Sequence, residues 1–271
     1  MITFPNAKIN LGLYVERKRE DGYHDLSTVF YPIPLTDAVE VVEAKETALF
    51  TYGNPVDCPP EKNLVMKAYR LMEEEFKLPT VAIHLYKHIP DGAGLGGGSS
   101  DATSVAKILN SMFALGLSEE EIAVRVKRLG ADCPFFAYNR PMAARGIGDL
   151  LEPVDVDLRG YTMIVVKPDV SVPTAAAYAG VTPHVPETDV EKLVAKPVGQ
   201  WKGFLVNDFE ESIFPKHPEL SAIKQSLYDA GAVYASMSGS GSAIFGLFED
   251  DNLSDIFAAK CAQPLLYKMK L

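Results

Sequence analysis

A glycine-rich segment at residues 90–101 sets the strongest limit on the folds open to this chain. It reads Pro-Asp-Gly-Ala-Gly-Leu-Gly-Gly-Gly-Ser-Ser-Asp, and residues 102–113 then carry apolar side chains at helical spacing. Glycines let a backbone approach an anion closely, and a helix start offers free N–H groups and the positive end of its dipole. Ser99, Ser100 and Asp101 are residue types that cap helices. The segment therefore predicts a phosphate-binding loop, and the alternative is a mobile linker capped by Ser99.

Two common nucleotide-binding motifs do not account for this segment. Gly92, Gly94 and Gly97 satisfy the Gly-x-Gly-x-x-Gly pattern, but a dinucleotide fold needs an acidic residue about 20 positions later at a strand end. The acidic residues at 119–121 instead begin a predicted helix. A Walker loop needs a lysine after its last glycine, and none follows here. Both standard nucleotide folds are therefore disfavoured.

Patterns of strands and helices surround the segment. Alternating apolar residues predict a half-buried strand at residues 8–15, with Lys8 and Asn10 on one face. A polar loop is predicted at residues 17–24, and a second Gly/Ser-rich turn at residues 237–242. Further strands are predicted at residues 29–31, 39–42, 49–51, 81–85, 163–166, 233–235 and 243–248, and helices at 63–76, 102–113, 118–129 and 220–227.

Composition limits the class of protein. The 271 residues, 47% of them hydrophobic, suffice for two packed domains. A net charge of -10 disfavours a nucleic-acid partner, because phosphate backbones attract surplus Lys and Arg. Three widely spaced cysteines suggest neither disulfides nor a zinc site, and no apolar run approaches the roughly 18 residues of a membrane span. We therefore expect a cytoplasmic protein with no membrane partner and no dedicated metal site.

These motifs, in this order, resemble the superfamily of galactokinase, homoserine kinase, mevalonate kinase and phosphomevalonate kinase. That superfamily combines an early lysine strand, a glycine-rich phosphate loop and a late Gly/Ser turn. Within it, the chain is most similar to the branch that phosphorylates 4-diphosphocytidyl-2-C-methyl-D-erythritol. The similarity spans nearly the whole chain and rests on residues 7–11, 21–24, 90–101, 130–136, 172–174, 207–210 and 237–242.

The resemblance implies an α+β fold of two domains. Residues 1–157 would form an ATP-phosphate-binding domain like ribosomal protein S5 domain 2, with a left-handed βαβ unit, and residues 158–271 an α+β substrate-side domain. The implied reaction is the ATP-dependent phosphorylation of the 2-hydroxyl of the cytidyl substrate, in non-mevalonate isoprenoid biosynthesis. ATP would bring Mg²⁺, with Ser100 or a nearby carboxylate as a possible ligand. Monomer and homodimer both stay open.

The resemblance also implies roles for individual residues. Lys8 and Asp132 match the catalytic pair: Asp132 would accept or orient the hydroxyl proton, and Lys8 would keep that carboxylate ionised. The ATP-phosphate loop would comprise Pro90, Asp91, Gly92, Ala93, Gly94, Leu95, Gly96, Gly97, Gly98, Ser99 and Ser100. Substrate contacts would come from Asn10, Tyr23, His24, Thr174 and Tyr178, with Tyr23 stacking on cytosine, His24 bonding its polar edge and Tyr178 as a second aromatic against the base. Lys87, which leads into the glycine-rich segment, is a further substrate-binding candidate that would reach phosphates of the substrate or nucleotide.

Simpler interpretations of the same residues remain. Asp132 could be only a helix N-cap ahead of Pro134, Lys8 and Lys87 could be solvated strand charges, and residues 239–242 an ordinary hairpin turn. A sibling kinase for mevalonate, homoserine or a sugar is one alternative function, and a silent nucleotide- or RNA-binding module is another. The Asp-Gly-Tyr-His run at 21–24 disfavours the sibling, and Lys8 with Asp132 disfavours the silent module. The chain departs from the family at Thr103, Cys133 and Asp149.

Overall fold

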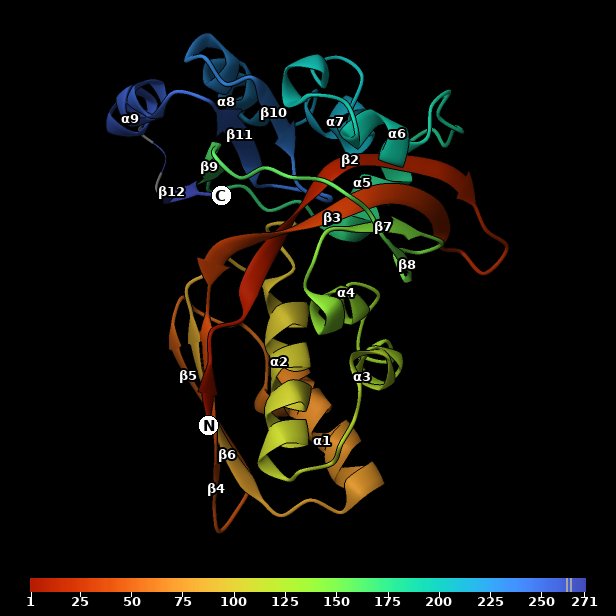
Figure 1. The fold of residues 1–271 in the computed structure, drawn as a ribbon, viewed down its shortest axis with the longest axis vertical. Coiled ribbons are helices and arrows are strands. Elements are labelled where there is room, and N and C mark those ends of the chain that lie inside the picture. Colours follow the sequence, from red (N-terminus) through yellow and green to blue (C-terminus); the bar gives the residue numbers. More distant parts are fainter. Residues whose placement is uncertain (262, 264) are drawn as a thin grey trace. The chain divides into compact units, whose positions relative to one another are not determined.

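The computed structural model describes residues 1–261, 263 and 265–271 (Figure 1). The chain forms two compact units, each assembled from several segments of the sequence. Unit 1 comprises residues 1–8, 35–91 and 96–140, and unit 2 comprises residues 9–34, 92–95 and 141–271. The α+β fold class is confirmed, while a domain boundary between residues 157 and 158 stays a prediction.

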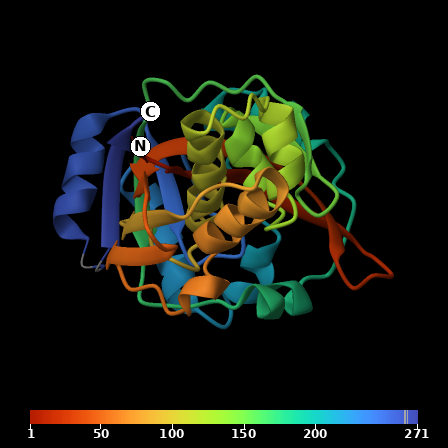
Figure 2. The same cartoon turned by 90° about the horizontal axis from the view of Figure 1, so that it is seen from below.

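Unit 1 is a four-stranded sheet with helices packed on one face. The sheet has the order β1-β4-β6-β5, in which only the β5–β6 pair is parallel. Helices α1 and α2 lie side by side against this sheet in both views (Figures 1 and 2). The elements are β1 (Ile2–Thr3), β4 (Ala38–Glu43), β5 (Ala48–Gly53), η1 (Pro60–Lys62), α1 (Leu64–Phe76), β6 (Val81–Lys87), α2 (Gly97–Met112), α3 (Glu119–Val126) and α4 (Cys133–Tyr138).

The core of unit 1 forms where the inward faces of the sheet meet the helices. Alternate residues of β6 point inward, so Ile83 and Leu85 are buried together with Val105 and Leu109 of α2. Burying each such side chain contributes roughly 1.5–3 kcal/mol to folding. This core fixes the end of β6 and the start of α2, between which the glycine-rich segment runs.

Unit 2 contains two further four-stranded sheets, with the orders β2-β3-β7-β8 and β10-β11-β9-β12. Phe209, Ile213, Leu220 and Ile223 from its helices pack with strand residues in one buried cluster. The strands are β2 (Asn6–Lys18), β3 (His24–Thr36), β7 (Met142–Arg145), β8 (Leu150–Pro153), β9 (Thr162–Lys167), β10 (Tyr234–Met237), β11 (Ile244–Phe248) and β12 (Leu265–Lys270). The helices are α5 (Thr174–Gly180), α6 (Val190–Val194), η2 (Val198–Gln200), α7 (Phe209–Ile213), α8 (Pro218–Asp229) and α9 (Asp251–Lys260).

Most predicted elements are confirmed, and some helix ends match in detail. Asn63 is the N-cap of α1, where its side chain accepts a hydrogen bond from Val65 N at 3.0 Å. At the start of α3, Ser118 and Glu121 form a capping box, in which each side chain accepts the backbone N–H of the other residue. Among the described residues, no helix has both the length and the apolar character needed to cross a membrane.

Four local predictions were wrong. The strand predicted as half-buried is buried on both faces, because Lys8 and Asn10 find polar partners inside the protein. Ser99, Ser100 and Asp101 do not cap α2, since the N-cap is Gly96, a residue without a side chain to cap with. The helix predicted to continue to residue 129 ends at Val126. The loop predicted at residues 17–24 is shorter, because its two ends belong to β2 and β3.

Candidate active site

Lys8 and Asp132 meet within unit 1. Lys8 lies in β2, and Asp132 directly precedes α4. The Nζ atom of Lys8 is 3.4 Å from Oδ2 of Asp132, and the two side chains are 4% and 35% exposed. A buried cation thus faces a carboxylate that a ligand can reach. The structure brings together the two residues that the sequence suggested for catalysis.

Asp132 occupies the N-cap position of α4 without capping the helix. Its backbone is helical, with φ -79° and ψ -18°, and its side chain makes no capping hydrogen bond. Pro134 stands in the first turn and has no N–H for a cap to accept. The carboxylate therefore turns toward Lys8, and the interpretation of Asp132 as only a helix cap is not supported.

The glycine-rich segment passes close to this pair at Gly96. Gly96 has φ +71°, and a Cβ atom there would lie 2.8 Å from Cζ of Phe136 and 3.1 Å from Cγ of Lys8. Both the backbone conformation and the available space therefore require glycine. Ser100 N is the first backbone N–H of α2 to donate to a helix carbonyl, that of Gly96 at 2.9 Å. The N–H groups before it have no carbonyl within the helix, as at any helix start, so they can face an anion.

Lys87 joins the two ends of the glycine-rich segment in unit 1. Its buried ammonium donates to the Asp37 carboxylate and, at 2.7 Å, to Oδ2 of Asp101 in the first turn of α2. Asp37 also accepts the backbone N–H groups of His88 at 2.5 Å and Ile89 at 2.7 Å. Lys87 was predicted to reach a phosphate, and its observed partners are these two carboxylates. We refer to Lys87, Asp37 and Asp101 as the buried triad.

Burial and the neighbouring charges together set where protons lie in the buried triad. Burial raises the pKa of Asp101 to about 8, against the lowering effect of the Lys87 charge. The pKa of Lys87 is raised because attraction to Asp101 and Asp37 outweighs its burial. The buried Oδ1 atom of Asp101 has no hydrogen-bond partner in the described structure. A proton on Asp101 would leave one cation with one carboxylate, which is the arrangement that burial favours.

A pocket of about 150 Å³ opens beside the first turn of α2 in unit 1. Lys87, Gly98 and Asp101 form part of its lining, with Lys62 and Asn63 at the start of α1. Small-molecule sites typically combine apolar walls with a few placed polar groups, and this pocket also contacts apolar residues of β6 and α1. A recess suited to part of a small ligand therefore adjoins the predicted phosphate loop.

Within unit 2, the Gly/Ser-rich turn between β10 and β11 supports the first half of the glycine-rich segment. Ser238 Oγ donates to the carbonyl of Gly94 at 2.8 Å, and Ala243 N donates to that of Ala93 at 3.1 Å. Gly94 has φ +78°, and a Cβ atom there would overlap the carbonyl oxygen of Ser238. The turn therefore shapes the loop as well as joining two strands.

Asn207 and Glu210 hold this Gly/Ser-rich turn in place. Asn207 Nδ2 donates to the carbonyls of Met237 and Gly239, both at 2.8 Å. Glu210 accepts the backbone N–H of Met237 at 2.8 Å. Asn10, predicted to contact substrate, donates from its side chain to Thr28 Oγ1 at 3.0 Å and from its backbone to Ser238 Oγ at 3.3 Å.

Two of the aromatic residues predicted for base recognition lie together in unit 2. The rings of His24 and Tyr178 stack with centroids 5.0 Å apart and an interplanar angle of 20°. Burial, followed by the charge of Lys18, lowers the pKa of His24 below its ordinary value of 6.5. Tyr23 is 61% exposed, which leaves its ring accessible to a partner. Thr174 Oγ1 lies 3.2 Å from Ser240 Oγ, beside the Gly/Ser-rich turn.

Two of the departures from the family pattern contact each other. Thr103 Oγ1 lies 2.9 Å from the carbonyl oxygens of both Ser99 and Cys133 and can donate its one proton to either, which places it between α2 and the start of α4 next to Asp132. Burial raises the pKa of the Cys133 thiol to about 11. Cys133 is therefore an unreactive packing residue. The third departure, Asp149, accepts the backbone N–H of Ile147 at 3.2 Å in the turn between β7 and β8.

Asp37 was not among the residues predicted from the sequence. It lies between Leu35 and Val39, both buried, and this isolated carboxylate between apolar strand positions was the available signal. Within the described part of the chain, no cluster of three or more His, Cys, Asp or Glu side chains is placed to hold a metal ion.

Comparisons with known proteins agree with this geometry. The family model of the GHMP kinases N terminal domain matches residues 63–140, and that of GHMP kinases C terminal matches residues 191–264. The chain is 52% identical over 255 residues to 4-diphosphocytidyl-2-C-methyl-D-erythritol kinase of Bacteroides thetaiotaomicron, covering 93% of each chain. It is 45% identical over 272 residues to the kinase of the same name from Cytophaga hutchinsonii, covering 98% of this chain and 100% of the relative.

Solved structures give the same result. A crystal structure of 4-(cytidine 5'-diphospho)-2C-methyl-D-erythritol kinase matches with a TM-score of 0.84 and 34% identity, covering 99% of this chain and 98% of the other. The mevalonate kinase of Methanococcus jannaschii shares the fold, with a TM-score of 0.75 and 14% identity over 100% of this chain and 98% of the other. The two family models and the close relatives together show that the chain belongs to the GHMP kinase family.

Proposed function

We propose that this protein transfers the γ-phosphate of ATP to the 2-hydroxyl of 4-diphosphocytidyl-2-C-methyl-D-erythritol, a step of isoprenoid precursor synthesis. Relatives about half identical over nearly the full chain carry the name of this kinase. Within the site, one observation carries the proposal: buried Lys8 faces the partly exposed carboxylate of Asp132 at 3.4 Å. The sibling kinases share the fold at 12–16% identity, so they do not support a different substrate.

The proposed chemistry is an in-line displacement. The substrate hydroxyl oxygen forms a bond to the γ-phosphorus, and the bond from that phosphorus to the bridging oxygen of ADP breaks. Asp132 accepts the proton that the hydroxyl loses. Lys8 neutralises charge on the transferring group, while the N–H groups at the start of α2 bind the phosphates. Placing these groups before the reaction lowers the barrier, because they need no reorganisation during transfer.

Kinases of this type act on ATP together with Mg²⁺, which supplies charge neutralisation at the phosphates. Magnesium is usually bound through one or two carboxylates plus phosphate oxygens and water, and so needs no closed protein cage. Asp132 fits this requirement, since its carboxylate is 35% exposed next to the predicted phosphate loop. The hydroxyl of Ser100, in the first turn of α2, is a second candidate ligand.

The cytidine base is assigned to residues of unit 2. Tyr23 offers an exposed ring for stacking, and His24, whose pKa is lowered, is neutral at pH 7 and can both donate to and accept from a base edge. Tyr178 supports the His24 ring by stacking on it, at 5.0 Å between ring centroids. We place this enzyme in the cytoplasm, where ATP is available.

The test is a substrate comparison with the purified chain, magnesium and ATP, followed by mass spectrometry. The expected product is the cytidyl substrate heavier by one phosphoryl group, with ADP released in equal amount. Mevalonate and homoserine should remain unchanged under the same conditions. Phosphorylation of either of these, with none of the cytidyl substrate, would show that the assignment of substrate is wrong.

A further inference from the structure

The turn between β2 and β3 carries Tyr23 and His24, and it is tied by a regular set of backbone contacts. Arg19 N donates to the carbonyl of Tyr23 at 2.8 Å, and Gly22 N donates to that of Arg19 at 3.2 Å. Gly22 has φ +88°, a conformation that glycine adopts without strain. Asp21 Oδ1 accepts the N–H of Tyr23 at 3.1 Å. The backbone of Tyr23 is therefore fixed on both sides, although its side chain is exposed.

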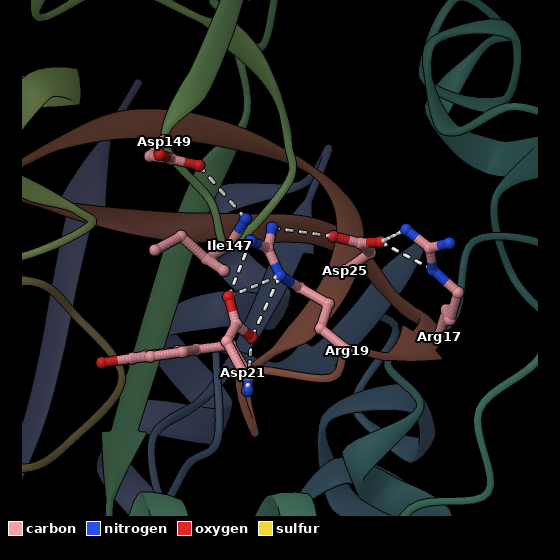
Figure 3. A network of polar contacts seen from close by, with 7 residues as sticks. Arg17, Arg19, Asp21, Asp25, Ile147 and Asp149 are labelled. Atoms are coloured by element: carbon pink, nitrogen blue, oxygen red, sulfur yellow. Dashed lines mark hydrogen bonds and ion pairs between the residues drawn. The ribbon is translucent and has the colours of Figure 1, made fainter.

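Four charged side chains surround this turn, and we call Arg17, Arg19, Asp21 and Asp25 the arginine–aspartate network. Arg19 donates two hydrogen bonds to Oδ2 of Asp21, from Nε at 3.1 Å and from Nη2 at 2.7 Å. Its Nη1 also lies 3.3 Å from Oδ1 of Asp25, whose Oδ2 accepts from Arg17 Nε at 2.9 Å. Figure 3 shows Arg19 between the two carboxylates, with Arg17 on the other side of Asp25.

The sequence positions of these contacts explain their effect. Asp21 precedes Tyr23 by two residues and Asp25 follows it by two, so Arg19 bridges the two flanks of the Tyr23–His24 pair. Hydrogen bonds from Arg19 lower the pKa of Asp21, and those from Arg17 lower the pKa of Asp25. Both carboxylates are therefore ionised at neutral pH. An isolated exposed ion pair stabilises a protein little, but a bidentate pair within a network can fix a local geometry.

We infer that Arg19, through Asp21 and Asp25, is a positioning residue that holds Tyr23 and His24 ready to receive the cytosine base. The inference rests on the proposed function, because it concerns the substrate assigned to these two residues. A turn held in its binding conformation loses less conformational entropy when the ligand arrives. Loss of Arg19 should therefore weaken binding of the cytidyl group and leave the phosphoryl-transfer step unchanged.

The decisive variant is Arg19→Gln, and the chain provides a matched control. On the loop before β9, Arg159 also pairs with an aspartate two residues away through Nε and Nη2. Its Nε lies 2.9 Å from Oδ1 of Asp157 and its Nη2 lies 2.6 Å from Oδ2. The expected result for Arg19→Gln is a rise of about tenfold in the KM of the cytidyl substrate and in the Kd of cytidine 5'-diphosphate. Its kcat and its KM for ATP should change less than about twofold, and Arg159→Gln should leave all four constants within that limit.

Two further measurements separate a positioning role from a direct contact. The double variant Arg19→Gln/Asp21→Asn should bind cytidine 5'-diphosphate about as weakly as Arg19→Gln alone, since both changes break the same link. The amide that replaces the Asp21 carboxylate in that variant still offers an oxygen to the Tyr23 N–H. Hydrogen exchange of a peptide covering residues 20–25 should be faster in Arg19→Gln than in the wild type.

Each contrary result has a distinct meaning. A loss in the double variant equal to the sum of the losses in Arg19→Gln and in Asp21→Asn would show that the two residues act independently, which would overturn the positioning role through Asp21. Unchanged nucleotide binding in Arg19→Gln would overturn the inference altogether. If the wild-type chain fails to phosphorylate the cytidyl substrate, the proposed function is wrong and the inference is withdrawn with it.

Discussion

The Nζ atom of Lys8 lies 3.4 Å from Oδ2 of Asp132, although the lysine side chain is almost fully buried and the carboxylate is not. The cation is held in place by the protein interior, while the partner can exchange its neighbours with solvent or substrate. An ion pair with one accessible member suits a reaction in which that member takes up a proton.

Replacement of Asp132 by Asn should abolish most turnover. The amide keeps the shape but cannot accept the hydroxyl proton, so we expect kcat to fall about 10²–10⁴-fold with ATP affinity retained. Steady-state kinetics and calorimetric titration with ATP measure the two effects. The control is Asp189→Asn, because Asp189 also occupies an N-cap position without a capping hydrogen bond and pairs with a lysine, at 2.7 Å from Lys192. Turnover of Asp132→Asn close to wild type would reduce Asp132 to a structural residue.

Replacement of Gly96 by Ala should damage both stability and ATP binding. A left-handed conformation costs alanine about 1–2 kcal/mol, and overpacking against Phe136 adds about 1–3 kcal/mol. Gly116→Ala is the control, since Gly116 has φ +73° but open space around its missing side chain. Urea unfolding should show the larger loss for Gly96→Ala, which alone should also raise the KM for ATP. Equal losses in both variants would mean that Phe136 and Lys8 relax without cost.

Acidic conditions should weaken binding of the cytidyl substrate. Burial keeps the pKa of His24 below 6.5, so the ring is neutral at pH 7 and gains a proton only as the pH falls through that lowered value. Protonation removes the acceptor nitrogen, and it also costs folding free energy because the folded state disfavours the charged form. The KM of the cytidyl substrate should therefore rise as the pH falls through this lowered pKa. In His24→Gln the KM should be raised at neutral pH and should not rise further in acid. A further rise in acid in this variant would come from another titrating group.

The buried triad should respond unequally to loss of its two carboxylates. Asp37 binds Lys87 and two backbone N–H groups, so Asp37→Asn should destabilise the protein by about 3–5 kcal/mol. Asp101, with its pKa raised to about 8, already favours its protonated form at neutral pH, which an amide resembles. Asp101→Asn should therefore cost clearly less. Urea unfolding at pH 7 compares them, and a larger loss for Asp101→Asn would reverse this account.

Much of the site could be predicted because its signals are local in sequence. The glycines, the helix that follows them and the run Asp-Gly-Tyr-His each lie within a dozen residues, and the family resemblance supplied Lys8 and Asp132. Gly96 as the N-cap was not predicted, because Ser99 and Asp101 are better capping residues by type. Both lie inside the helix instead, where the Asp101 carboxylate binds Lys87, a contact that only tertiary structure defines.

The long-range contacts could not be predicted from the sequence. Asp37 is 50 residues from Lys87 and 52 from Ile89, so nothing in the local pattern links them. The strand that contains Lys8 shows alternating polarity, yet it is buried on both faces. Alternation shows which side chains are polar, but it does not show whether another element of the fold covers the polar face. The arginine–aspartate network was not predicted for a related reason, as charges near a turn are usually only solvated.

The buried triad also limits how this protein can vary among its relatives. Loss of Lys87 alone would leave the buried Asp37 carboxylate without its cation, and loss of Asp37 alone would leave Lys87 and the backbone of His88 without their shared partner. Removing one partner of a buried ion pair costs more than removing the whole group. Substitutions at positions 37 and 87 should therefore accumulate together in evolution, while position 101 should accept Asn more readily. Covariation between positions 37 and 87 would record an electrostatic constraint on the predicted phosphate loop at residues 90–100, which contains neither of them.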